Sequence, residues 1–305
     1  MTDSNVQMKA LKGLLLFGIS ALIAGACFNP PELPDTPQIS YDGDIYFRDG
    51  GGSGQKDSLV ITINFKDGDG DLGLSSDLTD SPFNDVNMYL GNNGDTTAVG
   101  KKTLPYDLPQ FLDVSSGAQG KLLTMRSTRS AEYSYLPKYT DADNCLYYMY
   151  DSVYVEDAYK SIFTGTDIHV KDTLYLENPS PGRPPLPAYV LLDTFFYRTN
   201  PNYANIDVRF FYKVGTGSDL SKDYVEFDWT KEFCTISFNQ RFPILTSNAG
   251  PLEGKLTYAM VTTGIRSIFT TKPMRLLVKI RDRALHTSNV VDTGDFTLDD
   301  IKRGG

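Results

Sequence analysis

The sequence is poor in the residues that most often carry catalysis. Its 305 residues include three cysteines, two histidines and one tryptophan. Neither His169 nor His286 has a sequence neighbour at the spacing of a zinc site or of a nucleophile elbow. The glycine-rich run 50–54 leads into a strand pattern and not into a helix, so it does not fit a phosphate-binding loop. We therefore predict that the protein is not an enzyme, although 38 acidic residues leave a carboxylate pair for glycoside hydrolysis open.

Positive charge is also in the minority. The chain has 29 Lys and Arg against 38 Asp and Glu, which gives a formal net charge of −9. An acidic surface repels nucleic-acid phosphates, so we expect no nucleic-acid partner. The same charge opposes adhesion to anionic lipid, and any attachment to a bilayer then has to come from acyl chains.

The chain has only one long apolar run, and it lies near the N-terminus. Lys9 and Lys12 precede the apolar residues 13–24, and small residues then lead to Cys27. A short apolar segment behind positive charges is typical of an export signal, and small residues before a cysteine resemble the lipobox of bacterial lipoproteins. We predict a signal peptide over residues 1–26 and lipid attachment at Cys27. The alternative is an ordinary cleaved signal with an incidental cysteine.

The other two cysteines are Cys145 and Cys234, and neither belongs to a C-x-x-C motif. In an oxidising envelope compartment, an isolated pair favours one disulfide, and closing so long a loop stabilises a fold substantially in the chain-entropy model. Two separate buried thiols are the alternative.

Alternation with a period of two dominates the rest of the chain, and helical periodicity is nearly absent. Residues 27–38 contain four prolines and are expected to form an extended tether. Apolar and polar residues then alternate, as in 59–66 and 274–280, between turn-forming clusters. The pattern predicts an all-β fold, an immunoglobulin-like β-sandwich over residues 39–305.

One stretch inside this predicted sandwich has a different character. Residues from about 100 to 201 are rich in tyrosine, and the prolines of 179–187 interrupt any continuous sheet. We predict a long Tyr-rich insertion between the sandwich strands. A second independent domain is the alternative.

Three aspartates alternate with glycines directly after the first predicted long strand. Carboxylates two residues apart, here Asp67, Asp69 and Asp71, can surround one hard cation because glycine permits tight curvature and oxygen ligands suit Ca²⁺. Leu72 and Leu78 stand where an EF-hand needs its glycine and its bidentate glutamate. We predict a structural calcium site that is not an EF-hand; the alternative is a solvated turn rich in Asp and Gly.

The motif Asp-Gly-Asp-Gly-Asp-Leu-Gly at 67–73, the run 281–291 and the tetrapeptide 251–254 together resemble a group of uncharacterised Bacteroidota outer-envelope lipoproteins with immunoglobulin-like β folds. The resemblance implies a lipid-anchored protein of the outer membrane, on its periplasmic face or at the cell surface. Relatives commonly have the sequence Asp-Arg-Ala-Gly-Asn, and this chain has Leu285 and His286 in place of the Gly and the Asn. The resemblance therefore does not imply a turn geometry that relies on that Gly.

The C-terminal motif also offers further ligands for the predicted ion. If the last two strands flank the strand that precedes the acidic motif, Asp282 and Asn289 would join the three aspartates. The alternative is that Asp282 belongs to a hairpin turn and that Asn289 caps a backbone.

These patterns predict a structural or protein-interaction role. We expect an accessory subunit of an outer-membrane assembly in secretion, motility or nutrient uptake, with an outer-membrane protein as partner and acyl chains in the lipid bilayer. The alternative is a surface glycan-binding lipoprotein, because 19 tyrosines and 17 phenylalanines offer rings that stack on sugars. Exposed rings over 130–160 would favour glycan binding, and buried rings would favour a scaffold.

Overall fold

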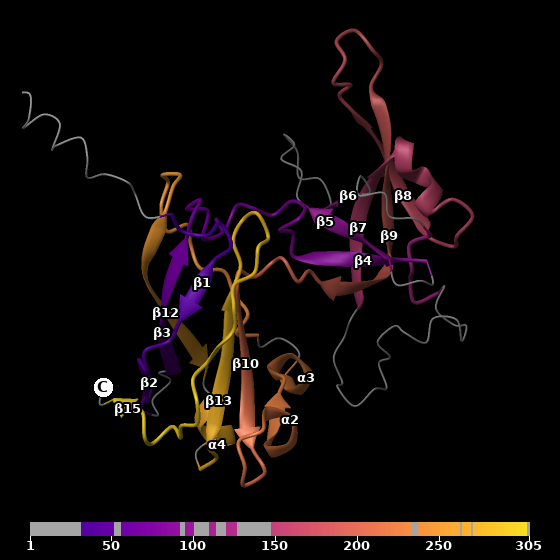
Figure 1. Cartoon of the computed structure of the whole chain (residues 1–305). Coiled ribbons are helices and arrows are strands. Elements are labelled where there is room, and N and C mark those ends of the chain that lie inside the picture. Colours follow the sequence, from indigo (N-terminus) through magenta and orange to yellow (C-terminus); the bar gives the residue numbers. More distant parts are fainter. Residues whose placement is uncertain are drawn as a thin grey trace, which may run out of the picture.

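The computed structural model of the chain describes residues 32–51, 56–91, 95–100, 110–113, 120–126, 148–233, 237–262, 264–269 and 271–303. Cys27, Cys145 and Cys234 lie outside these residues, so the lipid attachment and the disulfide stay predictions. The described chain is mostly β-strand and forms three sheets, which confirms the all-β prediction (Figure 1).

The first sheet is built around one long strand. Strand β3 (Asp57–Asp67) pairs along its whole length with β12 (Leu252–Thr262). On its other edge β3 pairs with β1 (Gln38–Ser40) and with β2 (Ile45–Arg48). The short strand β15 (Lys302–Arg303) continues the sheet beside β2. Every other residue of β3 from Leu59 onward is buried, as the alternating pattern predicts.

A second sheet faces the first across one hydrophobic core. Its strands, in spatial order, are β11 (Tyr224–Phe227), β10 (Ile206–Lys213), β13 (Met274–Ile280) and β14 (Val291–Asp292). Side chains of β3, β10, β12 and β13 belong to the same buried cluster, which also contains Trp229. We call these two sheets and their shared core the two-sheet body.

The third sheet has a core of its own. Its strands, in spatial order, are β4 (Val86–Leu90), β5 (Asp95–Gly100), β6 (Gln110–Asp113), β7 (Tyr148–Glu156), β9 (Leu186–Thr199) and β8 (His169–Leu176). Because β4 also pairs with β9, the first five of these strands close into a ring. Inside it lie Met88, Val153, Leu191 and Phe195. The long hairpin of β8 and β9 projects from the molecule (Figure 1).

The third sheet begins at Val86, before the predicted insertion boundary of about residue 100. The reason is that β4 pairs with Tyr197–Thr199 at the end of β9, more than a hundred positions along the chain, and not with the two-sheet body. A pairing over that separation leaves no local signal in the sequence.

Helices in the described part of the chain are short. They are the 3₁₀ helix η3 (Asp157–Ile162) and the α-helices α2 (Leu220–Asp223), α3 (Trp229–Phe233) and α4 (Ile265–Phe269). None of these described helices is long and apolar enough to cross a membrane.

Candidate metal centre

The acidic loop, residues 67–73, closes one end of the two-sheet body. Three distant segments hold it through backbone hydrogen bonds. Gly68 N donates to Pro34 O at 2.9 Å, and Gly250 N donates to the carbonyl oxygen of Asp69 at 3.0 Å. In the third segment, Arg283 N donates to the carbonyl oxygen of Asp71 at 3.4 Å. Leu72 is fully buried in the core and anchors the far side of the loop.

The glycines of the motif are required by this packing. A Cβ on Gly68 would collide with the backbone of Leu33, which passes directly over the loop. Gly70 adopts a φ of +72°, in the left-handed region that glycine enters without strain, and a Cβ there would strike the carbonyl of Gly250. The alternation of aspartate with glycine therefore lets the loop curl while other backbone segments lie against it.

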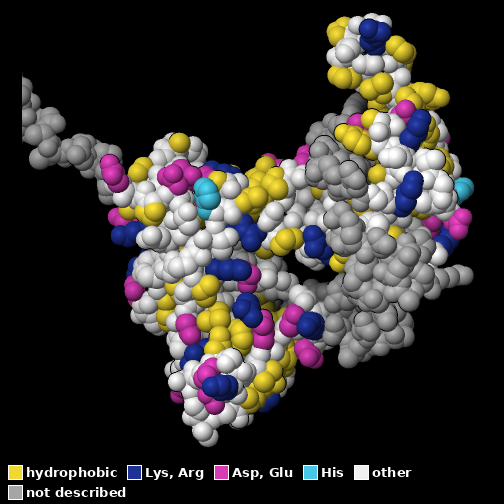
Figure 2. Space-filling view, turned by 45° about the vertical axis from the view of Figure 1, so that its right-hand side comes forward, with side chains coloured by type: hydrophobic (Ala, Val, Ile, Leu, Met, Phe, Trp, Pro, Cys, Tyr) yellow, Lys and Arg dark blue, Asp and Glu magenta, His cyan; other side chains and the backbone are white. Residues whose placement is uncertain are grey.

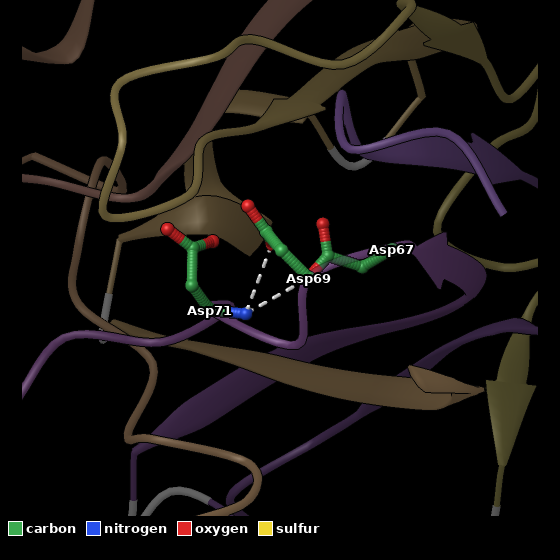
Figure 3. A group of neighbouring side chains, drawn as sticks. All are labelled: Asp67, Asp69 and Asp71. Atoms are coloured by element: carbon green, nitrogen blue, oxygen red, sulfur yellow. Dashed lines mark hydrogen bonds between the residues drawn. The ribbon is translucent and has the colours of Figure 1, made fainter. Parts of the chain in front are cut away.

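The three carboxylates project to one side of the curled loop (Figure 3). One oxygen from each of Asp67, Asp69 and Asp71 lies within 4.8 Å of the others. Each aspartate also has an oxygen bound to a backbone N–H. Asp67 Oδ2 accepts from Asp71 N at 3.0 Å, Asp69 Oδ1 accepts from the same N–H at 3.3 Å, and Asp71 Oδ2 accepts from Ala284 N at 2.9 Å. These bonds fix the orientation of all three side chains.

Two of the remaining oxygens lack a hydrogen-bond partner among the described residues. Asp67 Oδ1 and Asp71 Oδ1 are buried and accept no hydrogen bond from any residue that the structure describes. Asp67 is fully buried, and its burial, together with the charges of Asp69, Asp71 and Asp282, raises its pKa to about 6. Burial, and then the charges of Asp282 and Asp69, also raise the pKa of Asp71. A buried carboxylate without a partner is costly, and a cation among these oxygens would remove that cost.

Asp282 lies beside the acidic loop but faces a different partner. An isolated bridge joins its backbone to Leu72, so the two motifs meet, although β13 and β14 belong to the second sheet and do not flank β3 as the prediction supposed. Both carboxylate oxygens of Asp282 are engaged by His286, with the backbone N–H at 2.7 Å and Nδ1 at 2.9 Å. Burial raises the pKa of Asp282, against the hydrogen bonds from His286. Asp282 thus adds negative charge to the site, while each of its oxygens accepts a hydrogen bond from His286.

Asn289 does not join the cluster. Its side-chain oxygen accepts from Ile39 N at 2.8 Å, and its amide nitrogen donates to Ile39 O, also at 2.8 Å. These two bonds fasten β1 to the C-terminal segment. Of the alternatives that the sequence left open for Asn289, the structure shows backbone capping.

The pair of His286 and Asp282 was not found from the sequence. The two residues are four positions apart, but their surrounding sequence has no helical periodicity that would bring them together. They lie in a turn in which Leu285 has a φ of +70°. Leu285 therefore adopts a backbone conformation that glycine enters without strain and that a residue with a Cβ rarely adopts. The hydrogen bond that its ring donates to Asp282, together with the charge of that carboxylate, raises the pKa of His286.

Acidic side chains gather at this end of the two-sheet body (Figure 2). The tyrosines of the described Tyr-rich segment differ in burial: Tyr154 is buried in a small cluster, Tyr159 packs against the core of the third sheet, and Tyr175 of β8 is 72% exposed. Residues 127–147 lie outside the described residues. Trp229 lies in the core, 4.9 Å from Phe238 between ring centroids.

Comparison with known proteins finds no match: no protein-family model, no curated protein and no solved structure matches the chain.

Proposed function

We propose that the chain is a lipid-anchored envelope lipoprotein whose two-sheet body is stiffened by one calcium ion at Asp67, Asp69 and Asp71. The observation that carries the ion is the pair of buried oxygens, Asp67 Oδ1 and Asp71 Oδ1, that accept no hydrogen bond from the described residues. Calcium fits because the candidate ligands are all carboxylates, and hard oxygen ligands are the ones that Ca²⁺ takes.

The proposed body is an immunoglobulin-like sandwich. Support comes from two sheets that enclose one core, with alternate residues of each strand facing inward. In such modules an ion at the end of the sheets would fasten the loops to one another. The acidic loop already meets the tether segment and the loop at Gly250, so an ion there would hold three parts of the chain together.

The proposed role is structural or interactive, as an accessory subunit of an outer-membrane assembly, with acyl chains on Cys27 in the bilayer. None of the side chains described for the candidate site places a nucleophile beside a base, and we propose no enzymatic activity. His286 is bound to Asp282 as part of a turn, which accounts for it without a reaction.

The ion is tested by calorimetric titration of calcium into metal-free protein. We expect one ion per chain in the wild type and loss of binding in Asp67→Asn. Asp80→Asn removes an exposed acidic charge outside the cluster and serves as the matched control, so it should bind calcium as the wild type does. Absence of calcium binding by the folded wild type would refute the proposed ion.

The role is tested separately by affinity purification of the tagged lipoprotein from detergent-solubilised envelopes. A stoichiometric outer-membrane protein in the eluate is the expected result. Recovery of the lipoprotein alone would contradict the role of accessory subunit. It would not contradict the proposed calcium ion.

A further inference from the structure

A cavity of about 590 Å³ lies directly against the acidic loop. Its volume is within the range of small-molecule sites in proteins, about 300–1,000 Å³. Asp69 and Asp71 form part of its wall, and Ser75, Arg283 and residues 246–249 form much of the rest. Asp67 does not line the cavity and lies fully buried behind the other two carboxylates.

This geometry leaves the proposed ion incompletely coordinated by protein. One oxygen of each aspartate is held by a backbone N–H, so each side chain has one oxygen to give. Three such oxygens fill only part of the shell of Ca²⁺, which takes about 6 to 8 oxygen ligands. Because Asp69 and Asp71 stand at the cavity wall, open positions of the ion would face the cavity.

Arg283 supplies the same cavity with a positive group in addition to the proposed calcium ion. Its guanidinium donates one hydrogen bond, from Nη1 to Gly73 O at 3.2 Å, and forms no ion pair within 4.0 Å among the described residues. Its positive charge already acts on the carboxylate of Asp71, where it opposes the rise in pKa, so Arg283 stands close to the acidic loop. A guanidinium has five N–H donors, so most of its donors are left for a ligand. Arg283 and the ion together would attract a carboxylate.

The other polar groups of the wall are neutral with one exception. Ser75, Thr246, Ser247 and Asn248 supply hydroxyl and amide groups. Asp77 also lines the cavity, and its Oδ1 accepts hydrogen bonds from the hydroxyls of Ser75 and Ser76. Hydroxyl and amide groups suit the many hydroxyls of a sugar, and a bound calcium ion coordinates hydroxyl and carboxylate oxygens alike.

We propose that this cavity binds an acidic saccharide, whose carboxylate and a neighbouring hydroxyl complete the coordination of the calcium ion while Arg283 pairs with the carboxylate. The proposal rests on the proposed ion and names the ligand of the same site. Glycan binding then depends on an ion and an arginine, and not on the tyrosines.

The test is calorimetric titration of two tetrasaccharides into the folded protein, first with saturating calcium and then with EDTA. The acidic probe is hyaluronan tetrasaccharide, which contains glucuronate, and the neutral probe is chitotetraose. We expect binding of the acidic probe in calcium only, with chitotetraose about tenfold weaker or silent because the charged contacts are missing. Arg283→Gln should weaken binding of the acidic probe about tenfold, while calcium still binds, because removal of a positive charge near Asp71 does not disfavour the cation.

Three results would overturn the proposal. They are equal binding of the two probes, binding of the acidic probe that persists in EDTA, and no binding of either probe to the calcium-loaded protein. In each of these cases calcium itself still titrates, so the proposed ion stands. Failure of calcium to bind at all would instead refute the ion and the saccharide site with it.

Discussion

Each aspartate of the acidic loop uses one oxygen to hold the loop and leaves the other free for a cation. The loop is therefore shaped before an ion arrives, since the hydrogen bonds from Asp71 N and Ala284 N are formed within the chain. The metal-free state carries the cost of this arrangement, because three like charges lie close together and one of them, Asp67, is fully buried.

Substitution of Asp67 by asparagine should stabilise the metal-free protein. It removes the most buried charge of the cluster, and the raised pKa of Asp67 indicates a gain on the order of 2 kcal/mol in the free energy of unfolding. Urea denaturation in EDTA measures the gain. The same variant should lose the stabilisation by calcium that the wild type shows. A metal-free Asp67→Asn less stable than the wild type would contradict this account of the loop.

Leu285 is a second residue at which the chain carries strain. Its φ of +70° is unfavourable for a side chain that has a Cβ, by roughly 1 to 2 kcal/mol. We expect Leu285→Gly to raise the free energy of unfolding by about 1 kcal/mol, after allowing for the extra freedom of glycine in the unfolded chain. Thermal denaturation checks it, with Leu285→Ala as the control that keeps the Cβ and should show no gain.

Among the secondary-structure elements, Asp295 joins three strands of the second sheet. It pairs with Lys213 of β10 and Arg275 of β13, both at 2.8 Å, and accepts from the hydroxyl of Tyr224 in β11 at 2.6 Å. Burial alone would raise the pKa of Asp295, but hydrogen bonds from these three residues outweigh it and lower the pKa to about 2. The ionised form is thus favoured by the fold.

This lowered pKa predicts an acid-sensitive contribution to stability. A carboxylate whose pKa is lower in the folded state stabilises the fold fully above its unfolded pKa, about 3.9, and loses that contribution as the pH falls toward 2. Between about pH 5 and pH 2 the wild type should lose on the order of 1 kcal/mol more than Asp295→Asn does. Urea denaturation across that pH range compares them. Parallel pH profiles for the two proteins would contradict the prediction.

The strands of the two-sheet body were largely predictable, whereas β4 and β5 of the third sheet were not. Alternation marks β3 and β13 because each has one face on the core, and residues 59–66 and 274–280 match them closely. β4 and β5 are short, and their place depends on pairing with β9 far along the chain. The alternating pattern of a strand indicates which side chains face the core. It does not indicate with which distant strand the strand pairs.

The candidate site shows the same division. Asp67, Asp69 and Asp71 were identified because local spacing brings them together. Asn289 was assigned to the ion as one alternative, yet its partner is Ile39, 250 positions away, and no local pattern encodes that contact. The Arg283 guanidinium and the cavity beside the loop were missed for the same reason.

At the scale of the whole molecule, the acidic loop and the tether meet at one end of the two-sheet body. Pro34 contacts Gly68 at that end, and Cys27 lies seven residues earlier. Seven residues reach at most about 25 Å, even fully extended. If Cys27 is lipidated, the acidic end must therefore lie close to the bilayer.

This orientation is measurable on vesicles that carry the acylated protein. A fluorescent amino acid at Ser247, beside the acidic loop, should transfer energy to an acceptor lipid more efficiently than one at Ser218, an exposed residue beyond the far end of β10. Equal transfer from the two positions, or stronger transfer from Ser218, would contradict a membrane-proximal acidic end.

The central claim is that a calcium ion completes the fold at Asp67, Asp69 and Asp71, and thermal denaturation with and without calcium tests it most directly. Because calcium would relieve the buried charge, the midpoint of thermal unfolding in saturating calcium should lie several degrees above the midpoint in EDTA. Asp67→Asn should abolish this difference, and Asp80→Asn should keep it. An identical midpoint for the wild type in calcium and in EDTA would contradict the claim.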